Sequence, residues 1–300
     1  MLQLACVCLL AGISASYLEE PATDKAEGER WAVILVGIPG DEEHETLFRE
    51  TGDAWENWLT KTLNFSADHV LRLPSLPAEK DDAYTKLTAD AIRTTFADLS
   101  KKLHADDALW VFTLGHGNYD GKHAWFHVAG RDPSESDFGR WLSEVRCREQ
   151  VIWLTHSSSG WFVKPLTKAG RIVIAATAAD DESNETEFPH ALATVAEQPL
   201  ATIDADGDGK VSVSEFYTAV VQEVLHRFKS DKRLPTEHPQ LDDNGDGKGT
   251  EELAPTEDTA DTEAAAAKPA INKKVDGDLA RKTFFPYRKP AKSKDSNTPQ

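Results

Sequence analysis

The sequence is poor in cysteine and short of basic charge relative to acidic charge. Three of its 300 residues are cysteines, and Cys6 and Cys8 lie within the first ten residues. If that N-terminal stretch is removed, Cys147 remains alone, which excludes an intrachain disulfide and a zinc site made of several thiolates. The chain has 51 acidic and 33 basic residues, a formal net charge of -18. Such a surface repels phosphate backbones and attracts divalent cations, so we expect no nucleic-acid partner.

The apolar stretch at the N-terminus is too short to cross a membrane as a helix. It runs from Leu2 to Ile13 and ends in the small residues 14–16, which resemble a signal-peptidase site. No Lys or Arg precedes it. We predict a signal peptide over residues 1–16, export to the periplasm or the outside of the cell, and no transmembrane segment in the mature chain. If the segment is not a signal, the expected location is the cytoplasm.

Apolar runs alternate with segments of helical spacing over residues 28–198. Strands that are apolar along their whole length and separated by helices are typical of a mostly parallel sheet covered on both faces. The sequence therefore predicts an α/β fold. The predicted strands are 31–37, 69–75, 108–115, 151–156 and 170–178, with a hairpin at 121–130 and helices at 81–103, 134–145 and around Leu47 to Trp58.

Polar side chains follow two of these strands. Residues 115–120 place His116 between two glycines, and residues 156–160 contain Ser157, Ser158 and Ser159. If the two strands are neighbours, the imidazole and a serine hydroxyl face each other at one sheet edge. A nucleophile and its general base need this arrangement.

This order of strand ends resembles that of the caspase-like cysteine peptidases, most closely the legumain branch. Bacterial members share phrases similar to SSSGWFVKPL (157–166), GRIVIAAT (170–177) and NETEFPHAL (184–192). The resemblance covers residues 30–255 and implies a caspase-like three-layer sandwich over residues 28–198. It also implies that the catalytic histidine falls on His116 and the nucleophile on Ser157, 41 residues later.

The nucleophile position departs from the family because Ser157 replaces cysteine. A serine hydroxyl is much harder to ionise than a thiol and usually needs a base oriented by a carboxylate. We expect Ser158 and Ser159 to cap the next helix. In a live enzyme the free amides at the start of that helix, with the amide of Gly117, would form an oxyanion hole. Cys147 cannot replace Ser157 as the nucleophile. It precedes the predicted strand 151–156 and lies about 17 to 20 Å from the carboxyl end of that strand, which Ser157 follows.

Residues 199–255 contain a more specific motif. The segment 204–215 matches the twelve-residue calcium loop of an EF-hand, and a helix is expected directly after it. Positions 1, 3, 5 and 12 supply carboxylates, position 7 a carbonyl, and position 9 a hydroxyl that often acts through water. The expected Ca²⁺ ligands, in chain order, are Asp204, Asp206, Asp208, Lys210, Ser212 and Glu215.

A second and weaker calcium loop follows at residues 242–250. Its expected ligands are Asp242, Asn244, Asp246 and the Lys248 carbonyl, but the twelfth position is Leu253. Without the bidentate glutamate, either its affinity falls or the loop serves only as a structural turn. A similar LDDNGDG phrase in the legumain-like relatives favours the structural role.

Residues 256–300 show almost no apolar periodicity and are predicted to be disordered.

Three functions are consistent with the sequence. The first is a calcium-binding pseudopeptidase that acts as an exported binding or scaffolding module for a peptide or protein ligand. The second is an active hydrolase that uses Ser157 and His116. The third is a calcium-binding protein whose sheet domain is only a structural support.

Overall fold

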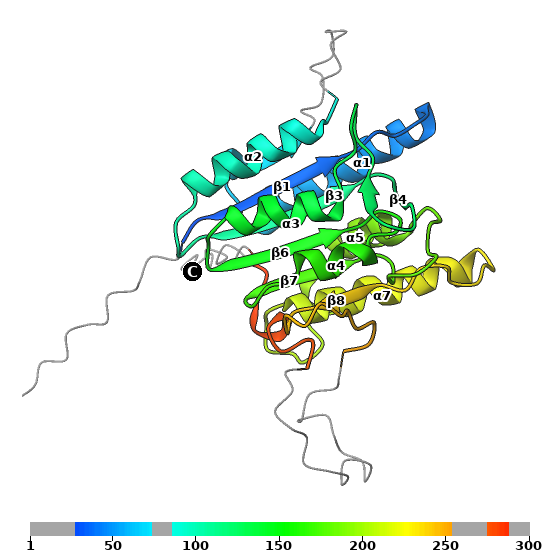
Figure 1. Cartoon of the computed structure of the whole chain (residues 1–300). Helices are drawn as coiled ribbons and strands as arrows, with labels where there is room; N and C mark the ends of the chain where they lie inside the picture. The colour runs from blue at the N-terminus through cyan, green and yellow to red at the C-terminus, as the bar shows by residue number, and fades with distance from the viewer. Residues whose placement is uncertain (1–27, 74–85, 254–274, 288–300) are drawn as a thin grey trace, which may run out of the picture.

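The computed structural model describes residues 28–73, 86–253 and 275–287, and it has an α/β fold built on a six-stranded sheet. The strand order is β2-β1-β3-β6-β7-β8, and all neighbours are parallel except β7 and β8 (Figure 1). The strands are β1 (Arg30–Val36), β2 (Val70–Leu73), β3 (Ala108–Leu114), β6 (Glu149–Leu154), β7 (Arg171–Ala175) and β8 (Gln240–Asp242).

Helices cover both faces of the sheet (Figure 1). One face packs against α2 (Ala89–Lys102), α3 (Glu135–Glu144) and α4 (Gly160–Leu166). The other face packs against α1 (Glu42–Asn57), α5 (Phe188–Ala196) and α7 (Val213–Ser230). The predicted α/β fold with a mostly parallel, doubly covered sheet is confirmed.

The pleat explains why the strands are apolar along their whole length. Within β1, Val33 and Leu35 face the core that contains α2 and α3, whereas Ala32 and Ile34 face the core that contains α1 and α7. Successive side chains of a strand point to opposite faces, so a strand between two helical layers needs apolar residues at every position.

Polar caps set the starts of several helices. Residues 81–85 of the helix predicted at 81–103 lie outside the described residues. Within the described part the helix begins at Ala89, because the Thr88 side chain caps it by accepting a hydrogen bond from the Ala91 amide. Asp41 caps α1 in the same way, through the His44 amide. The chain leaves α1 through a π-helical turn, η1 (Trp58–Thr62), and enters β2 through a short 3-10 turn, η2 (Ala67–His69).

The predicted hairpin at 121–130 lies earlier in the chain than expected. It consists of β4 (Gly117–Tyr119) and β5 (Ala124–Phe126), which form a separate two-stranded sheet. The chain turns at Gly121, whose φ of +90° favours glycine. Gly117 therefore belongs to the hairpin rather than to a loop before it.

The described part of the predicted calcium-binding segment, residues 199–253, is continuous with the rest of the domain. After the short helix α6 (Leu200–Ile203), helix α7 packs against α5 and shares the core of that sheet face, and β8 extends the sheet. The predicted boundary after residue 198 therefore does not separate two hydrophobic cores.

The prediction of disorder over residues 256–300 is wrong for residues 275–287. This segment includes a 3-10 turn, η4 (Ala280–Lys282), and buries Phe285 to 4% exposure. The Phe285 ring lies 5.4, 4.8 and 4.6 Å from the rings of Trp58, Trp110 and Phe216. One aromatic side chain can anchor a segment whose average composition is polar. The remainder of the predicted tail, and the predicted signal peptide, lie outside the described residues.

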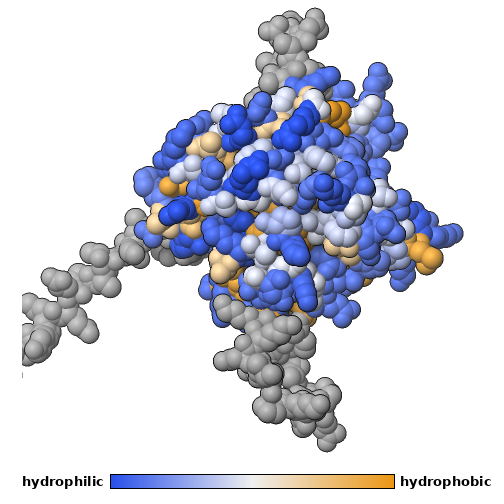
Figure 2. Space-filling model, viewed as in Figure 1, coloured by the Kyte–Doolittle hydropathy of each residue, from blue (hydrophilic) through white to orange (hydrophobic). Residues whose placement is uncertain are grey.

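The surface of the described part is mainly hydrophilic on the face shown in Figure 2. Its large exposed apolar side chains are separate from one another in sequence, at Leu225, Leu234 and Val275. No helix in the described ranges combines the length and the apolar character needed to cross a membrane.

Candidate functional site

The two predicted polar strand ends lie side by side. Strand β3 pairs with β6, and Thr113 is opposite Leu154 at the carboxyl ends of the two strands. The segments that carry His116 and Ser157 therefore leave the same edge of the sheet. A Cβ atom at Gly117 would lie 2.6 Å from His156 Nδ1 and 2.6 Å from the Ser157 carbonyl oxygen. Only glycine allows the hairpin to approach the Ser157 segment this closely.

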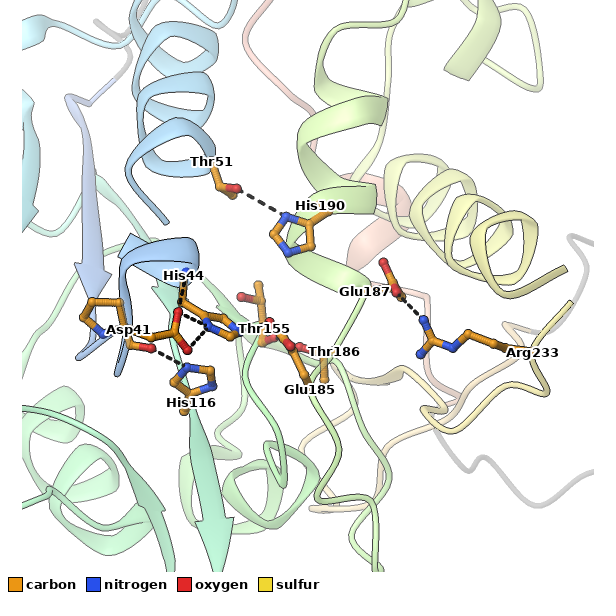
Figure 3. A network of polar contacts seen from close by, with 11 residues as sticks. Asp41, His44, Thr51, His116, Thr155, Glu185, Thr186, Glu187, His190 and Arg233 are labelled. Atoms are coloured by element: carbon orange, nitrogen blue, oxygen red, sulfur yellow. Dashed lines mark hydrogen bonds and ion pairs between the residues drawn. The ribbon is translucent and has the colours of Figure 1, made fainter. Parts of the chain in front are cut away.

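His116 is held by a backbone carbonyl at one of its ring nitrogens. Its Nε2 lies 3.0 Å from the Pro39 carbonyl oxygen, in the segment after β1 (Figure 3). A carbonyl only accepts, so Nε2 carries the hydrogen and Nδ1 is the basic nitrogen of the neutral ring. The rings of His44 and Phe48 lie 5.0 and 5.3 Å from that of His116.

His44 connects two loops beside His116 (Figure 3). Its Nδ1 lies 2.8 Å from Asp41, and its Nε2 lies 3.0 Å from Glu185 in the loop after β7. Hydrogen bonds to Asp41 and then to Glu185 raise the pKa of His44. The sequence analysis did not predict roles for His44 and Asp41. An aspartate three residues before a histidine at a helix start is typical of an N-cap and could have indicated their contact.

Ser157 is buried and makes no hydrogen bond to His116 in the described part of the chain. The residue is 4% exposed. Its carbonyl oxygen accepts a hydrogen bond from His156 Nδ1 at 2.9 Å. The fold thus brings the two predicted dyad residues to one edge of the sheet without joining their side chains.

The predicted oxyanion hole is occupied in part by the protein itself. The amide of Gly160, at the start of α4, donates to the Thr177 hydroxyl at 3.0 Å. The neighbouring Ser158 amide donates to the Glu182 carbonyl at 3.0 Å, so neither amide points at a free site. Ser158 has a φ of +58°, a conformation that is costly for a residue with a Cβ. The turn is held by the loop after β7, where Glu182 is also bonded to His238.

The prediction that Ser158 and Ser159 cap the next helix is wrong. Ser159 is the N-cap residue of α4, but its hydroxyl makes no capping bond. It instead accepts from the amides of Ala176 and Thr177, at 3.0 and 3.3 Å. These amides directly follow β7, and the Ala176 amide also donates to the Leu154 carbonyl at 2.8 Å. The hydroxyl therefore serves the sheet edge rather than the helix.

Cys147 lies where the sequence places it, before the amino end of β6 and therefore at the opposite end of that strand from Ser157. Burial raises the pKa of its thiol, and the Sγ atom lies 3.3 Å from the Glu149 carbonyl oxygen. A buried thiol with a raised pKa is a poor nucleophile.

Comparison with known proteins adds no relative to this picture. No family model and no curated protein matches the chain. The resemblance to the caspase-like peptidases therefore stays a prediction from the residues at the strand ends and from the phrases quoted above.

The first predicted calcium loop gathers three carboxylates. One carboxylate oxygen from each of Asp204, Asp206 and Asp208 lies within 4.8 Å of the others, and this group could hold a metal ion. The loop curls because Asp204 accepts from the amides of Gly207 and Gly209, at 2.8 and 2.9 Å. These turns hold the carboxylates on the inside of the loop.

Glu215, at position 12, folds back over the loop from the first turn of α7. Its Oε1 accepts from the amides of Ala205 and Asp206, at 2.9 and 3.4 Å. Its Oε2 accepts from the amide and the hydroxyl of Ser212, at 2.8 and 2.7 Å. Ser212 in turn accepts from the Glu215 amide, so the pair forms a capping box at the start of α7. Glu215, which would complete the metal site, therefore also stabilises the first turn of α7.

The second predicted loop has the same backbone curl. Asp242 accepts from the amides of Gly245 and Gly247, both at 3.0 Å. Leu253, at the twelfth position, packs against the apolar core and cannot bind a metal. A residue that the sequence-based prediction missed, Asp276, contacts this loop from the C-terminal segment. Asp276 lies 33 residues after Asp243 in the sequence, so no local pattern predicted this contact.

Proposed function

We propose that this chain is a calcium-binding protein that binds Ca²⁺ at residues 204–215 and carries a caspase-like domain without peptidase activity. The observation that supports calcium binding most directly is the grouping of the Asp204, Asp206 and Asp208 carboxylates within 4.8 Å of one another. Like charges at this distance repel, and a divalent cation between them removes that cost.

The donor set fits calcium. All side-chain donors of the loop are oxygens, and Ca²⁺ takes six to eight oxygen ligands in a flexible geometry. Neither a thiol nor an imidazole belongs to the loop, so the softer ligands that favour zinc are missing from it. An EF-hand loop also places a carbonyl at position 7, here that of Lys210.

Calcium at this loop would act on the hydrophobic core through α7. Glu215 lies in the first turn of α7, and the next residue, Phe216, is fully buried. The Phe216 ring contacts Trp58, Trp153 and Phe285, at centroid distances of 5.0, 5.8 and 4.6 Å. Fixing Glu215 on a cation therefore fixes the start of a helix that packs at the centre of the protein.

Three features support a domain without peptidase activity. The hydroxyl of Ser157 belongs to a buried residue, the Ser158 amide is bonded to Glu182, and no hydrogen bond links Ser157 to His116 within the described ranges. A serine nucleophile needs a base in contact and an open oxyanion site. We therefore propose that the domain acts by binding rather than by cleavage.

The alternative is an active hydrolase, and one observation favours it. The bond from His116 Nε2 to the Pro39 carbonyl leaves Nδ1 free to act as a base. In that case the Ser157 hydroxyl would attack an acyl carbon and give its proton to His116. The bond from the acyl carbon to the leaving group would then break, and His116 would pass the proton to that group.

Calorimetric calcium titration tests the main proposal. We expect Glu215→Gln to weaken binding at the first loop by at least about tenfold, because the affinity of such loops depends on the number of charged ligands. Glu197→Gln is the matched control, since it removes the same charge from an exposed residue outside the loop. Equal affinity in both variants would contradict calcium binding at residues 204–215.

A reactive-serine probe tests the proposed lack of activity. A fluorophosphonate should label the wild-type protein no more than Ser157→Ala. Labelling of the wild type that is lost in both Ser157→Ala and His116→Ala would establish the alternative. Peptide cleavage gained by Ser157→Cys would show that the scaffold is intact and that only the nucleophile is missing.

A further inference from the structure

The second calcium loop lacks its own closing ligand but otherwise repeats the first loop position by position. In each loop the residue at position 1 accepts from the amides at positions 4 and 6. In each loop the side chain at position 3 accepts from the amide at position 5, and position 5 accepts from position 7. Position 3 changes from Asp206 to Asn244 and position 9 from Ser212 to Thr250, and both changes keep a side-chain oxygen. Position 12 is the ligand position that loses its oxygen, because Leu253 replaces the glutamate.

Asp276 occupies the place that Glu215 has in the first loop. Its Oδ1 accepts from the amides of Asp243 and Asn244, at 3.2 and 3.3 Å. These are positions 2 and 3, whose counterparts in the first loop donate to Glu215 Oε1. Its Oδ2 accepts from the Thr250 hydroxyl at 2.8 Å. Thr250 is position 9, whose counterpart in the first loop, Ser212, donates its hydroxyl to Glu215 Oε2 at 2.7 Å.

Besides the loop geometry, three buried aspartates favour a bound cation at this site. Asp242, Asp243 and Asp276 are 1%, 6% and 5% exposed, which is unusual for aspartates. None of the three forms an ion pair with a Lys, Arg or His side chain of the described residues. Buried carboxylates are normally paired with a cation or bound to a metal. Each of the three accepts hydrogen bonds from backbone amides, but no basic side chain of the described residues neutralises their charge.

We infer that Asp276 supplies the missing acidic ligand of the second loop, so that residues 242–250 and Asp276 together form a second calcium site. The other ligands are Asp242, Asn244, Asp246 and the Lys248 carbonyl. The site is shared by two parts of the chain that are far apart in the sequence. The inference uses the first loop as its template and therefore rests on the proposed calcium binding there.

A cation at this site would hold the C-terminal segment against the domain. The Asp243 carboxylate already accepts from the amides of Gly277 and Ala280, at 2.9 and 2.7 Å. Further along, the Phe285 amide donates to the Val211 carbonyl at 2.9 Å, within the first loop. The segment 275–287 therefore contacts both calcium loops. Its docking is the structural property that calcium should change.

Calcium titration of five proteins tests the inference. The wild type should bind two Ca²⁺ ions, Asp276→Asn should weaken one of them by at least about tenfold, and Glu215→Gln should weaken the other. The double variant should lose both. Asp278→Asn is the matched control, because it removes the same charge from the same segment at an exposed side chain.

Hydrogen exchange provides a second measurement that does not depend on affinity alone. Calcium should slow exchange of the Gly277 and Ala280 amides in the wild type and in Asp278→Asn, but not in Asp276→Asn. The calcium-free melting temperature of Asp276→Asn should not fall below that of the wild type, because the substitution removes an uncompensated buried charge. This comparison distinguishes a lost ligand from a lost fold.

The outcomes separate the two proposals. Loss of all calcium binding in Glu215→Gln, with Asp276→Asn unchanged, would overturn the second site and leave the first. One site that is lost only in Asp276→Asn would support the second site and overturn the first. A wild-type protein that binds no calcium would overturn both.

Discussion

Glu237 is a carboxylic acid inside the protein with only one oxygen hydrogen-bonded in the described part of the chain. The residue is 2% exposed, and its Oε2 accepts from the Glu187 amide at 2.8 Å. Burial raises the pKa of Glu237 to about 8 from an ordinary 4.5, and the carboxylates of Glu187 and Glu182 add to the rise. Between these two values the folded state binds a proton that the unfolded chain releases. The free energy of unfolding therefore falls as the pH rises through this window, by at most about 1.4 kcal/mol per pH unit.

Glu237→Gln should remove this pH dependence. The neutral amide keeps an acceptor for Glu187 but never ionises, so the variant should be more stable than the wild type above about pH 8 and similar to it near pH 5. Urea unfolding at both pH values measures the difference. Glu197→Gln, which changes an exposed carboxylate, should leave the pH dependence in place. A stability difference that is the same at both pH values would refute the explanation.

Arg171 joins four elements at the amino end of the sheet. Its guanidinium donates to Gln150 Oε1 and to the carbonyls of Leu166 and Leu142, at 2.8, 2.6 and 3.0 Å. The residue is buried, and burial lowers its pKa to about 10. These bonds connect β6 and β7 to the ends of α4 and α3. A planar fork with several donors is needed to reach all three acceptors.

We expect Arg171→Lys to lower the free energy of unfolding by about 1 to 3 kcal/mol, because it leaves buried carbonyls without donors. Arg146→Lys, at an exposed position in the same region, should change it by less than about 0.5 kcal/mol. Denaturant unfolding of the two variants provides the comparison. Equal effects would show that the three hydrogen bonds contribute little.

Elements with a strong apolar pattern were predictable, and features that depend on distant contacts were not. The strands at 108–114 and 171–175 match their predicted ranges within a few residues, because each is buried on both faces and is apolar throughout. Capping by Ser159 was mispredicted because its hydroxyl binds amides beyond β7. The roles of Asp276 and Phe285 were missed because their partners lie far away in the sequence and their own neighbours are polar.

At the scale of the whole molecule, Phe285 connects the C-terminal segment to the core. Phe285→Ala should lower the free energy of unfolding by about 3 to 5 kcal/mol, the range for a fully buried phenylalanine. Phe284→Ala is the control, because its ring is half-buried and lies under the Lys210 ammonium at 4.9 Å. Urea unfolding compares the two. An equally small loss of unfolding free energy in both variants would show that the segment 275–287 contributes little to the stability of the domain.

The position of Phe285 also affects how the protein forms during synthesis. Trp58 and Trp110 are made early, and Phe285, which contacts both rings, is made more than 170 residues after Trp110. A nascent chain can form most of the sheet before the Phe285 ring is made, and until then Phe285 does not cover its side of the aromatic cluster. A chain stopped before residue 275 should therefore bind a hydrophobic dye and attract chaperones, and the full chain should not.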